Sequence, residues 1–197
     1  MRLSGGACVL VGNLNPAILR PDWVVKHGIL PDGGGSSGFG VGAAGITMRF
    51  TLAGLTWTPG PERLTVESES DDAEPGAFVA RVLEKLAHTP VRAVGNNYQF
   101  SIGSGDSSPS VIQHAFLSRF AGDKQFVGAS VVVKLSHDSG AVINATLDFD
   151  ENSNLKDFKV NFHRGASDAS AAAEAARKWR DDRAEALRLV ERLVGSP

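Results

Sequence analysis

Three consecutive residues, Ser136, His137 and Asp138, carry the side chains of a hydrolytic triad. A triad needs an imidazole that contacts both a hydroxyl and a carboxylate. Successive side chains near the end of a strand point to opposite faces, so His137 cannot bridge its two neighbours there. The Asp-Ser-Gly sequence at this point is typical of a hairpin turn. We therefore predict a turn, and no catalytic residue, at this segment.

Two glycine motifs in residues 31–45 match functional signatures. Gly40–Gly45 fits G-x-G-x-x-G, and Gly34–Gly38 fits G-x-S-x-G. The first binds a pyrophosphate only between a strand and a helix, and the second requires a strained strand-to-helix turn. Here a stretch rich in glycine and serine comes first and a period-two strand pattern follows. We predict a flexible loop over residues 31–45.

The segment from Asp148 to Asn154 starts like a calcium loop, with oxygen ligands at alternate positions. Its sixth position is Ser153 instead of Gly, and its twelfth is Lys159 instead of a bidentate Glu. The five histidines show no metal-binding spacing, and the single Cys8 provides neither a thiolate cage nor an internal disulfide. The sequence predicts no metal and no other cofactor.

Five polar side chains remain as candidates for contact with a ligand or a partner. Asn13 and Asn15 follow the first predicted strand, and Asn96 and Asn97 follow a glycine inside a later one. Asparagine beside glycine is typical of a turn or a β-bulge. The alternative is that these asparagines line a polar ligand pocket. Arg183 falls in the apolar stripe of the last predicted helix, where an unpaired charge is costly. It is expected to reach water or a carboxylate, or else to bind an anion or a partner.

The elements that must position these residues follow from hydrophobic periodicity. Strands are predicted at 7–11, 46–52, 64–66, 91–102, 127–135, 141–149 and 155–162, the 91–102 strand being interrupted at 95–97. Helices are predicted at 21–28, from residue 75 to the proline at position 90, at 108–122 and at 168–194.

The strands between residues 127 and 162 are joined by short turns, so they should be antiparallel, because a parallel return needs a crossover of a dozen or more residues. The predicted fold class is α+β, in a single domain over residues 1–197. It has a largely antiparallel sheet with helices packed on one face, ending in a three-stranded meander followed by a long helix. This fold requires Ile143, Trp179 and Val190 to be buried. The sequence contains no repeat of fixed period.

Three features together resemble a sporadically distributed family of uncharacterised bacterial proteins. They are the segment Val91–Tyr98 before a predicted helix, the meander that ends in Val160–His163, and the long final helix. The resemblance covers residues 46–194. It implies a bacterial protein and brings no activity or catalytic residues with it.

The composition is that of an ordinary globular chain of 197 residues, 42% of them hydrophobic. With 20 Lys+Arg against 22 Asp+Glu and the basic residues dispersed, it lacks the electrostatic footprint of a nucleic-acid-binding protein. The N-terminal apolar run, Ala7–Val11, is too short for a signal peptide or a membrane span. We expect a cytoplasmic location and no membrane or nucleic-acid partner.

Two classes of function remain open. The first is a non-enzymatic interaction or assembly protein, such as a homo-oligomer, that meets a partner through the C-terminal helix or a sheet edge. A helix over 168–194 spans about 40 Å, more than a typical strand of ~17–20 Å, so part of its apolar face should overhang the sheet. The second is a small-molecule-binding protein or unrecognised enzyme with a polar pocket between sheet and helices. The second requires the five candidate side chains to converge.

Overall fold

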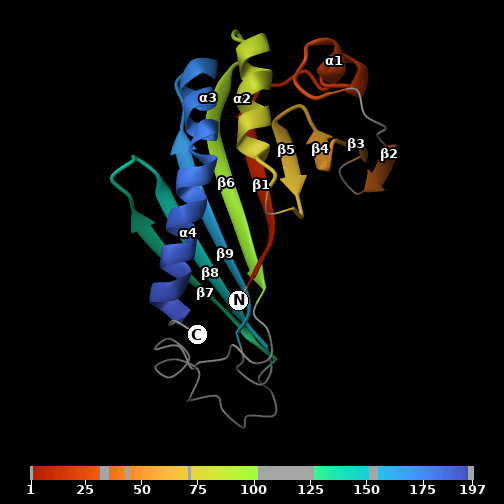
Figure 1. Cartoon of the computed structure of the whole chain (residues 1–197). Helices are drawn as coiled ribbons and strands as arrows, with labels where there is room; N and C mark the ends of the chain where they lie inside the picture. The colour runs from red at the N-terminus through yellow and green to blue at the C-terminus, as the bar shows by residue number, and fades with distance from the viewer. Residues whose placement is uncertain are drawn as a thin grey trace.

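The computed structural model (Figure 1) describes residues 2–31, 36–42, 45–70, 72–101, 127–150 and 155–194. These residues form one nine-stranded sheet and a set of helices. In chain order the elements are β1 (Arg2–Gly12), α1 (Pro21–Lys26), β2 (Ser36–Gly42), β3 (Gly45–Leu52), β4 (Leu55–Pro59), β5 (Arg63–Ser68), α2 (Pro75–Lys85), β6 (Val91–Ser101), β7 (Ala129–Ser136), β8 (Val142–Phe149), β9 (Leu155–Gly165), α3 (Ala169–Arg177) and α4 (Trp179–Val194).

Each pair of neighbouring strands is antiparallel, in the order β2-β3-β4-β5-β1-β6-β9-β8-β7. Strands β7, β8 and β9 form the predicted meander, because each strand pairs antiparallel with the one before it and the segments of sequence between them are only a few residues long. Helices α2, α3 and α4 lie together on one face of the sheet (Figure 1). Ile143, Trp179 and Val190 are buried, as this arrangement requires. The predicted α+β fold is confirmed.

The strand order is nearly symmetric about the central pair β1 and β6. Outward from β1 come β5, β4, β3 and β2, and outward from β6 come β9, β8 and β7. In each half the chain starts on the inner strand, returns from the outer strands inward, and ends in helix. Among the described residues the two halves therefore share one arrangement, apart from α1 and β2 in the first half, although the sequence shows no fixed repeat.

Side chains along the strands alternate between a covered face and a face without a described helix. On β1, Cys8 and Leu10 are buried under the helices, whereas Ala7 and Val9 remain partly exposed on the other face. The apolar residues of α2, α3 and α4 close over the covered face and complete the core. The helix-free face, in contrast, keeps a polar lining.

The predicted flexible loop at 31–45 is wrong for residues Ser36–Gly42, which form β2 and pair antiparallel with β3. Strand pairing uses backbone N–H and C=O groups, which glycine supplies as well as any other residue. Because the segment is rich in glycine and serine, its composition predicted a loop although its backbone forms a strand. Likewise β6 is continuous through residues 95–97, because β1 and β9 pair with it on both sides.

The predicted C-terminal helix is present, but it is divided at Lys178 into α3 and α4. Beyond the break, Leu189 is buried, while Leu187, which was predicted to face the core, is largely exposed. The break shifts the phase of the apolar stripe, which had been projected at a constant 100° per residue. The predicted helix at 108–122 lies outside the described residues.

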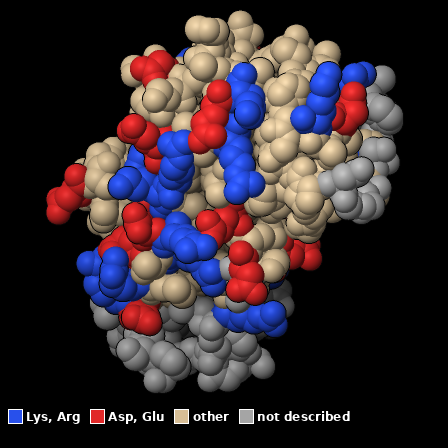
Figure 2. Space-filling model, turned by 45° about the horizontal axis from the view of Figure 1, so that its top comes forward, with Lys and Arg blue, Asp and Glu red and all other residues tan. Residues whose placement is uncertain are grey.

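No described helix is both long enough and apolar enough to cross a membrane. In the view of Figure 2, Lys and Arg side chains alternate with Asp and Glu side chains across the surface. Ion pairs between Arg177 and Glu84 and between Arg180 and Glu74 join the last two helices to α2 and its N-terminal end.

Candidate ligand-binding site

The structure separates the five predicted site residues. Asn13 and Asn15 are exposed in the loop after β1, where the Asn15 Oδ1 accepts a 3.1 Å hydrogen bond from the Ala17 N–H, as in a turn. Arg183 lies on α4, against a small hollow that Asp72 and Glu74 also line.

Asn96 and Asn97 are neighbours on β6 and therefore point to opposite faces of the sheet. Asn96 is fully buried on the helix side, whereas Asn97 is half-buried on the other side. A single pocket between sheet and helices that draws on all five predicted residues is therefore not formed. The ligand-binding hypothesis fails in that form, and only Asn97 contributes to the site described next.

A hollow of about 910 Å³ opens on the helix-free face of the sheet, and we call it the sheet hollow. Most of the residues that line it have polar side chains, and the lining crosses the centre of the sheet. The uncharged polar side chains that line it include Ser4, Thr51, Thr56, Asn97, Gln99, Asn144, Thr146 and Asn161, and the charged ones are Arg49, Glu67, Glu69 and Lys159. Both halves of the fold contribute to this lining.

Strand register places seven lining residues in one line perpendicular to the strands, which we call the cross-strand row. It runs through Asn144 on β8, Asn161 on β9, Asn97 on β6, Ala7 on β1, Glu67 on β5, Thr56 on β4 and Thr51 on β3. Three asparagines thus stand side by side on neighbouring strands, although they are distant in sequence.

Hydrogen bonds hold the centre of the row in place. The Asn161 Nδ2 donates to the Asn97 Oδ1 at 2.5 Å, and the Asn97 Nδ2 donates to the carbonyl oxygens of Ala7 and Gly95, each at 3.2 Å. The Asn97 amide is therefore fully engaged. The Asn161 Oδ1 and the Asn144 amide have no hydrogen-bond partner among the described residues, so they can bond to a ligand.

The central strand provides the floor of the sheet hollow. Gly5 and Ala7, which face the hollow from β1, have minimal side chains, and longer side chains stand on the strands to either side. A Cβ at Gly5 would lie 3.6 Å from the Ser68 carbonyl oxygen, which is ordinary contact. Small residues in the middle and long polar ones around them produce the depression.

Ion pairs balance the charges around the sheet hollow. Arg49 pairs with Glu67 at 3.2 Å, and Lys159 pairs with Asp148 at 2.8 Å. The hydrogen bond from Lys159 lowers the pKa of the Asp148 carboxyl, and the same bond raises the pKa of Lys159. Each cation thus faces an anion, and the hollow favours an uncharged ligand over an ionic one.

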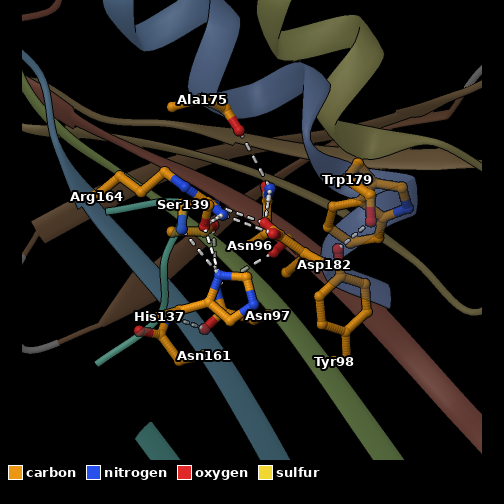
Figure 3. A network of polar contacts seen from close by, with 12 residues as sticks. Asn96, Asn97, Tyr98, His137, Ser139, Asn161, Arg164, Ala175, Trp179 and Asp182 are labelled. Carbon is orange, nitrogen blue, oxygen red and sulfur yellow. Dashed lines mark hydrogen bonds and ion pairs between the residues drawn. The ribbon is translucent and has the colours of Figure 1, made fainter. Parts of the chain in front are cut away.

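A buried polar network lies on the opposite side of the same strands (Figure 3). Arg164 of β9 donates two hydrogen bonds to Asp182 of α4, each 2.6 Å long, and their side chains are only 9% and 4% exposed. The Asn96 Nδ2 donates to the Asp182 Oδ2 at 2.8 Å and to the Ala175 carbonyl oxygen at 3.4 Å. The network fastens both C-terminal helices to the strands that carry the asparagine row.

The sequence did not indicate Arg164 or Asp182. The stripe projected over one continuous helix placed Arg183 inward, but the break at Lys178 turns Asp182 inward instead. The Arg164–Asp182 pair follows only from the packing of α4 against β9, which the sequence alone does not show.

Burial raises the pKa of the Cys8 thiol and of the Tyr98 hydroxyl, and the nearby Asp182 carboxylate raises both further. The Tyr98 hydroxyl donates a 2.5 Å hydrogen bond to the Trp179 carbonyl oxygen. Both groups are therefore neutral, and they act as parts of the core.

Ser136, His137 and Asp138 lie where β7 ends and the chain turns toward β8, as predicted. The Gly140 N–H donates to the His137 carbonyl oxygen at 2.9 Å, and the His137 Nδ1 lies 2.8 Å from the Ser139 Oγ. Arg164 donates a further bond to that Oγ at 3.0 Å. These contacts close the turn and connect it to the buried network.

Within the described ranges, no three His, Cys, Asp or Glu side chains come together in a way that could hold a metal ion. The first and twelfth positions of the calcium-like sequence, Asp148 and Lys159, form an ion pair with each other. Comparison of the sequence with models of protein families and with curated proteins finds no match.

Proposed function

We propose that this chain is a non-enzymatic binding protein whose ligand occupies the sheet hollow. The observation that carries the proposal is the 910 Å³ hollow with its line of neutral hydrogen-bonding side chains. A volume of this size lies within the roughly 300–1,000 Å³ range of small-molecule sites. The proposal moves the pocket from between sheet and helices to the opposite face of the sheet.

The centre of the site and its β3–β4 end are held in place by hydrogen bonds within the protein. Asn97 is held by Asn161 and by two backbone carbonyl groups, and Thr51 and Thr56 share a 3.0 Å hydrogen bond. Binding then requires little ordering of side chains, which would otherwise cost about 0.5–1.5 kcal/mol for each immobilised rotamer-rich side chain. Strands, which are rigid elements, carry these groups.

The test is a substitution that places a large side chain at the floor of the sheet hollow. Ala7→Phe places a ring in the hollow without entering the core, because residue 7 faces away from the helices. Val9→Phe is the matched control, because Val9 lies on the same face of β1 but does not line the hollow. The ligands tried are neutral oligosaccharides, a neutral decapeptide and a single-stranded decadeoxythymidylate.

Backbone amide NMR shifts report the binding. We expect at least one of these probes to shift signals of hollow-lining residues, with the effect lost in Ala7→Phe and kept in Val9→Phe. If no probe shifts those residues, or if Ala7→Phe binds as well as the unmodified protein, the proposal is wrong.

Self-association through strand β7 is a second candidate function. β7 is an edge of the sheet, and its Val132 is 61% exposed. On the other face of the strand, Val131, Val133 and Leu135 are only partly buried. An apolar edge strand presents unpaired backbone groups that a second copy of the same strand can pair with antiparallel, in a twofold dimer.

Light scattering at micromolar to millimolar concentrations tests this second candidate. We expect a dimer that Val132→Lys converts to a monomer, because a second lysine next to the exposed Lys134 on the same face adds like charge that opposes the pairing of two copies. Val142→Lys changes an exposed valine on β8, inside the sheet, and should leave the dimer intact. A protein that stays monomeric over the whole range would rule out self-association.

A further inference from the structure

We infer that the ligand of the sheet hollow is a neutral oligosaccharide that lies along the cross-strand row, perpendicular to the strands. The inference rests on the proposed binding function and specifies its ligand class. Three properties of the hollow support it: its length, the chemistry of its free groups, and its charge.

The length of the cross-strand row favours a ligand made of several linked units over a compact metabolite. The lining extends from Asn144 on β8 to Thr51 on β3, across seven neighbouring strands. With strands about 4.8 Å apart, the row is roughly 29 Å long. A ligand that contacts both ends must be extended, and it crosses the junction between the two halves of the fold.

The side-chain groups in the hollow that are free to form hydrogen bonds are suited to bind the hydroxyl groups of a ligand. Primary amides and hydroxyls both donate and accept hydrogen bonds, as sugar hydroxyls do. Asn144 and Asn161 present such groups beside Gln99 and Thr146.

A peptide is a weaker fit for this lining. Among the described lining residues, Ala7 is the only apolar side chain on this face, since Val160 and Tyr98 are buried on the helix side. Apolar side chains of a peptide would therefore find no pocket. The peptide backbone would also find no open strand edge at the centre of the sheet, because β1 and β6 are paired on both sides.

The charge disfavours a polyanion. Binding of a nucleic-acid backbone depends on cations free to contact phosphates. Here Arg49 is paired with Glu67 and Lys159 with Asp148, and Glu69 adds another negative charge to the lining. A sugar without carboxylate or sulfate groups avoids that repulsion.

The experiment compares probes of different chemistry on the full chain. Maltohexaose, cellohexaose and N-acetylchitohexaose are neutral sugars that differ in linkage or substituent and are long enough to span the row, and they are compared with the decapeptide and the decadeoxythymidylate. The described lining of the hollow offers few free hydrogen-bonding groups and no exposed aromatic ring for stacking, which implies a weak complex. Its dissociation constant should be on the order of millimolar, which NMR titration measures. We expect one of the sugars to shift signals at both ends of the cross-strand row.

Asn144→Asp tests the amide directly, because it keeps the size of the side chain, removes its donor and adds a negative charge. We expect sugar binding to weaken about tenfold or more. Asn13→Asp makes the same substitution on an exposed loop residue and should leave the affinity unchanged.

The possible outcomes separate this inference from the proposed function. If the peptide or the oligonucleotide binds in the hollow and no sugar does, the oligosaccharide inference is overturned while the binding function stands. If nothing binds in the hollow, both are overturned. If a sugar binds equally well to the protein and to its Asn144→Asp variant, the assignment of the row as the recognition element is wrong.

Discussion

At the scale of single residues, the arrangement depends on a few buried polar groups. The Arg164–Asp182 pair is almost fully enclosed and has good geometry, with two parallel hydrogen bonds. Taking two charges out of water costs several kcal/mol for each ion, so such a pair adds little net stability, but losing one partner leaves the other uncompensated. The pair therefore specifies where α4 docks.

Replacing Asp182 with alanine should lower the free energy of unfolding by about 3–5 kcal/mol, because the Arg164 guanidinium would remain buried without its counterion. Denaturation in urea measures this loss. Asp22→Ala is the control, because it breaks an ion pair with Arg20 that is mostly exposed, and it should cost no more than about 1 kcal/mol. Equal losses in the two variants would contradict the role assigned to the network.

Cys8 offers a test of pH dependence. Burial raises the pKa of its thiol above the unfolded value, so protonation of this group favours the folded state. That contribution is complete below the unfolded pKa, near 8.5, and is lost as the pH rises toward the folded pKa.

At pH 9, alkylation of Cys8 by iodoacetamide should therefore be more than tenfold slower in the native protein than in guanidinium chloride, because the native thiol is protonated and enclosed. In guanidinium chloride the thiol is exposed and ionises near its ordinary pKa of about 8.5. Mass spectrometry follows the labelling. A native rate at pH 9 within a few fold of the unfolded rate would show that the thiol is accessible and ionised.

At the scale of elements, the helix layer depends on a close approach of α2 to α3. A Cβ at Gly76 would lie 2.8 Å from the Trp179 Cβ and would collide with the Ala176 carbonyl oxygen. Glycine here allows the two helix backbones to meet, which brings Trp179 over Tyr98 with ring centroids 4.6 Å apart.

Gly76→Ala should destabilise the protein by about 1–3 kcal/mol through overpacking. The sign is informative, because the same substitution inside an unobstructed helix stabilises by about 0.5–1 kcal/mol. Gly5→Ala, whose new Cβ meets nothing closer than 3.6 Å, is the matched control and should be nearly neutral. Thermal unfolding followed by circular dichroism compares the three proteins, and a stabilised Gly76→Ala variant would contradict the packing.

At the scale of the whole molecule, two similar halves share one sheet and one helix layer. β1 and β6 pair along most of their length at the centre, and α2 of the first half contacts α3 of the second. A break between the halves would expose the core beneath both helices. The sheet hollow crosses this junction, so the binding site exists only when the halves are joined.

We therefore expect the halves to unfold together. Tryptophan fluorescence reports on Trp23 and Trp57 in the first half and on Trp179 in the second. This signal and far-ultraviolet circular dichroism should give the same midpoint in urea. Two separated transitions, or different midpoints for the two signals, would show that the halves are independent.

The sequence determined the fold class and most of the described elements. Alternating apolar residues in β7 and β8 and the short turns between them were enough to predict an antiparallel meander, since both signals are local. The apolar stripe of the last predicted helix likewise indicated that this helix packs on one face of the sheet. The local sequence pattern did not predict β2, which forms through backbone pairing. It also did not predict the break in the last helix at Lys178.

Only the tertiary structure decided the candidate site. Asn144 and Asn161 are ordinary strand residues in the sequence, and they form one row with the predicted candidate Asn97 because strands β6, β9 and β8 pair in a particular register. Asn96 and Asn97 looked equivalent, yet alternation along β6 places one in the core and the other in the hollow. Register and sheet order arise from contacts between residues far apart in the chain, and a local pattern carries no record of those contacts.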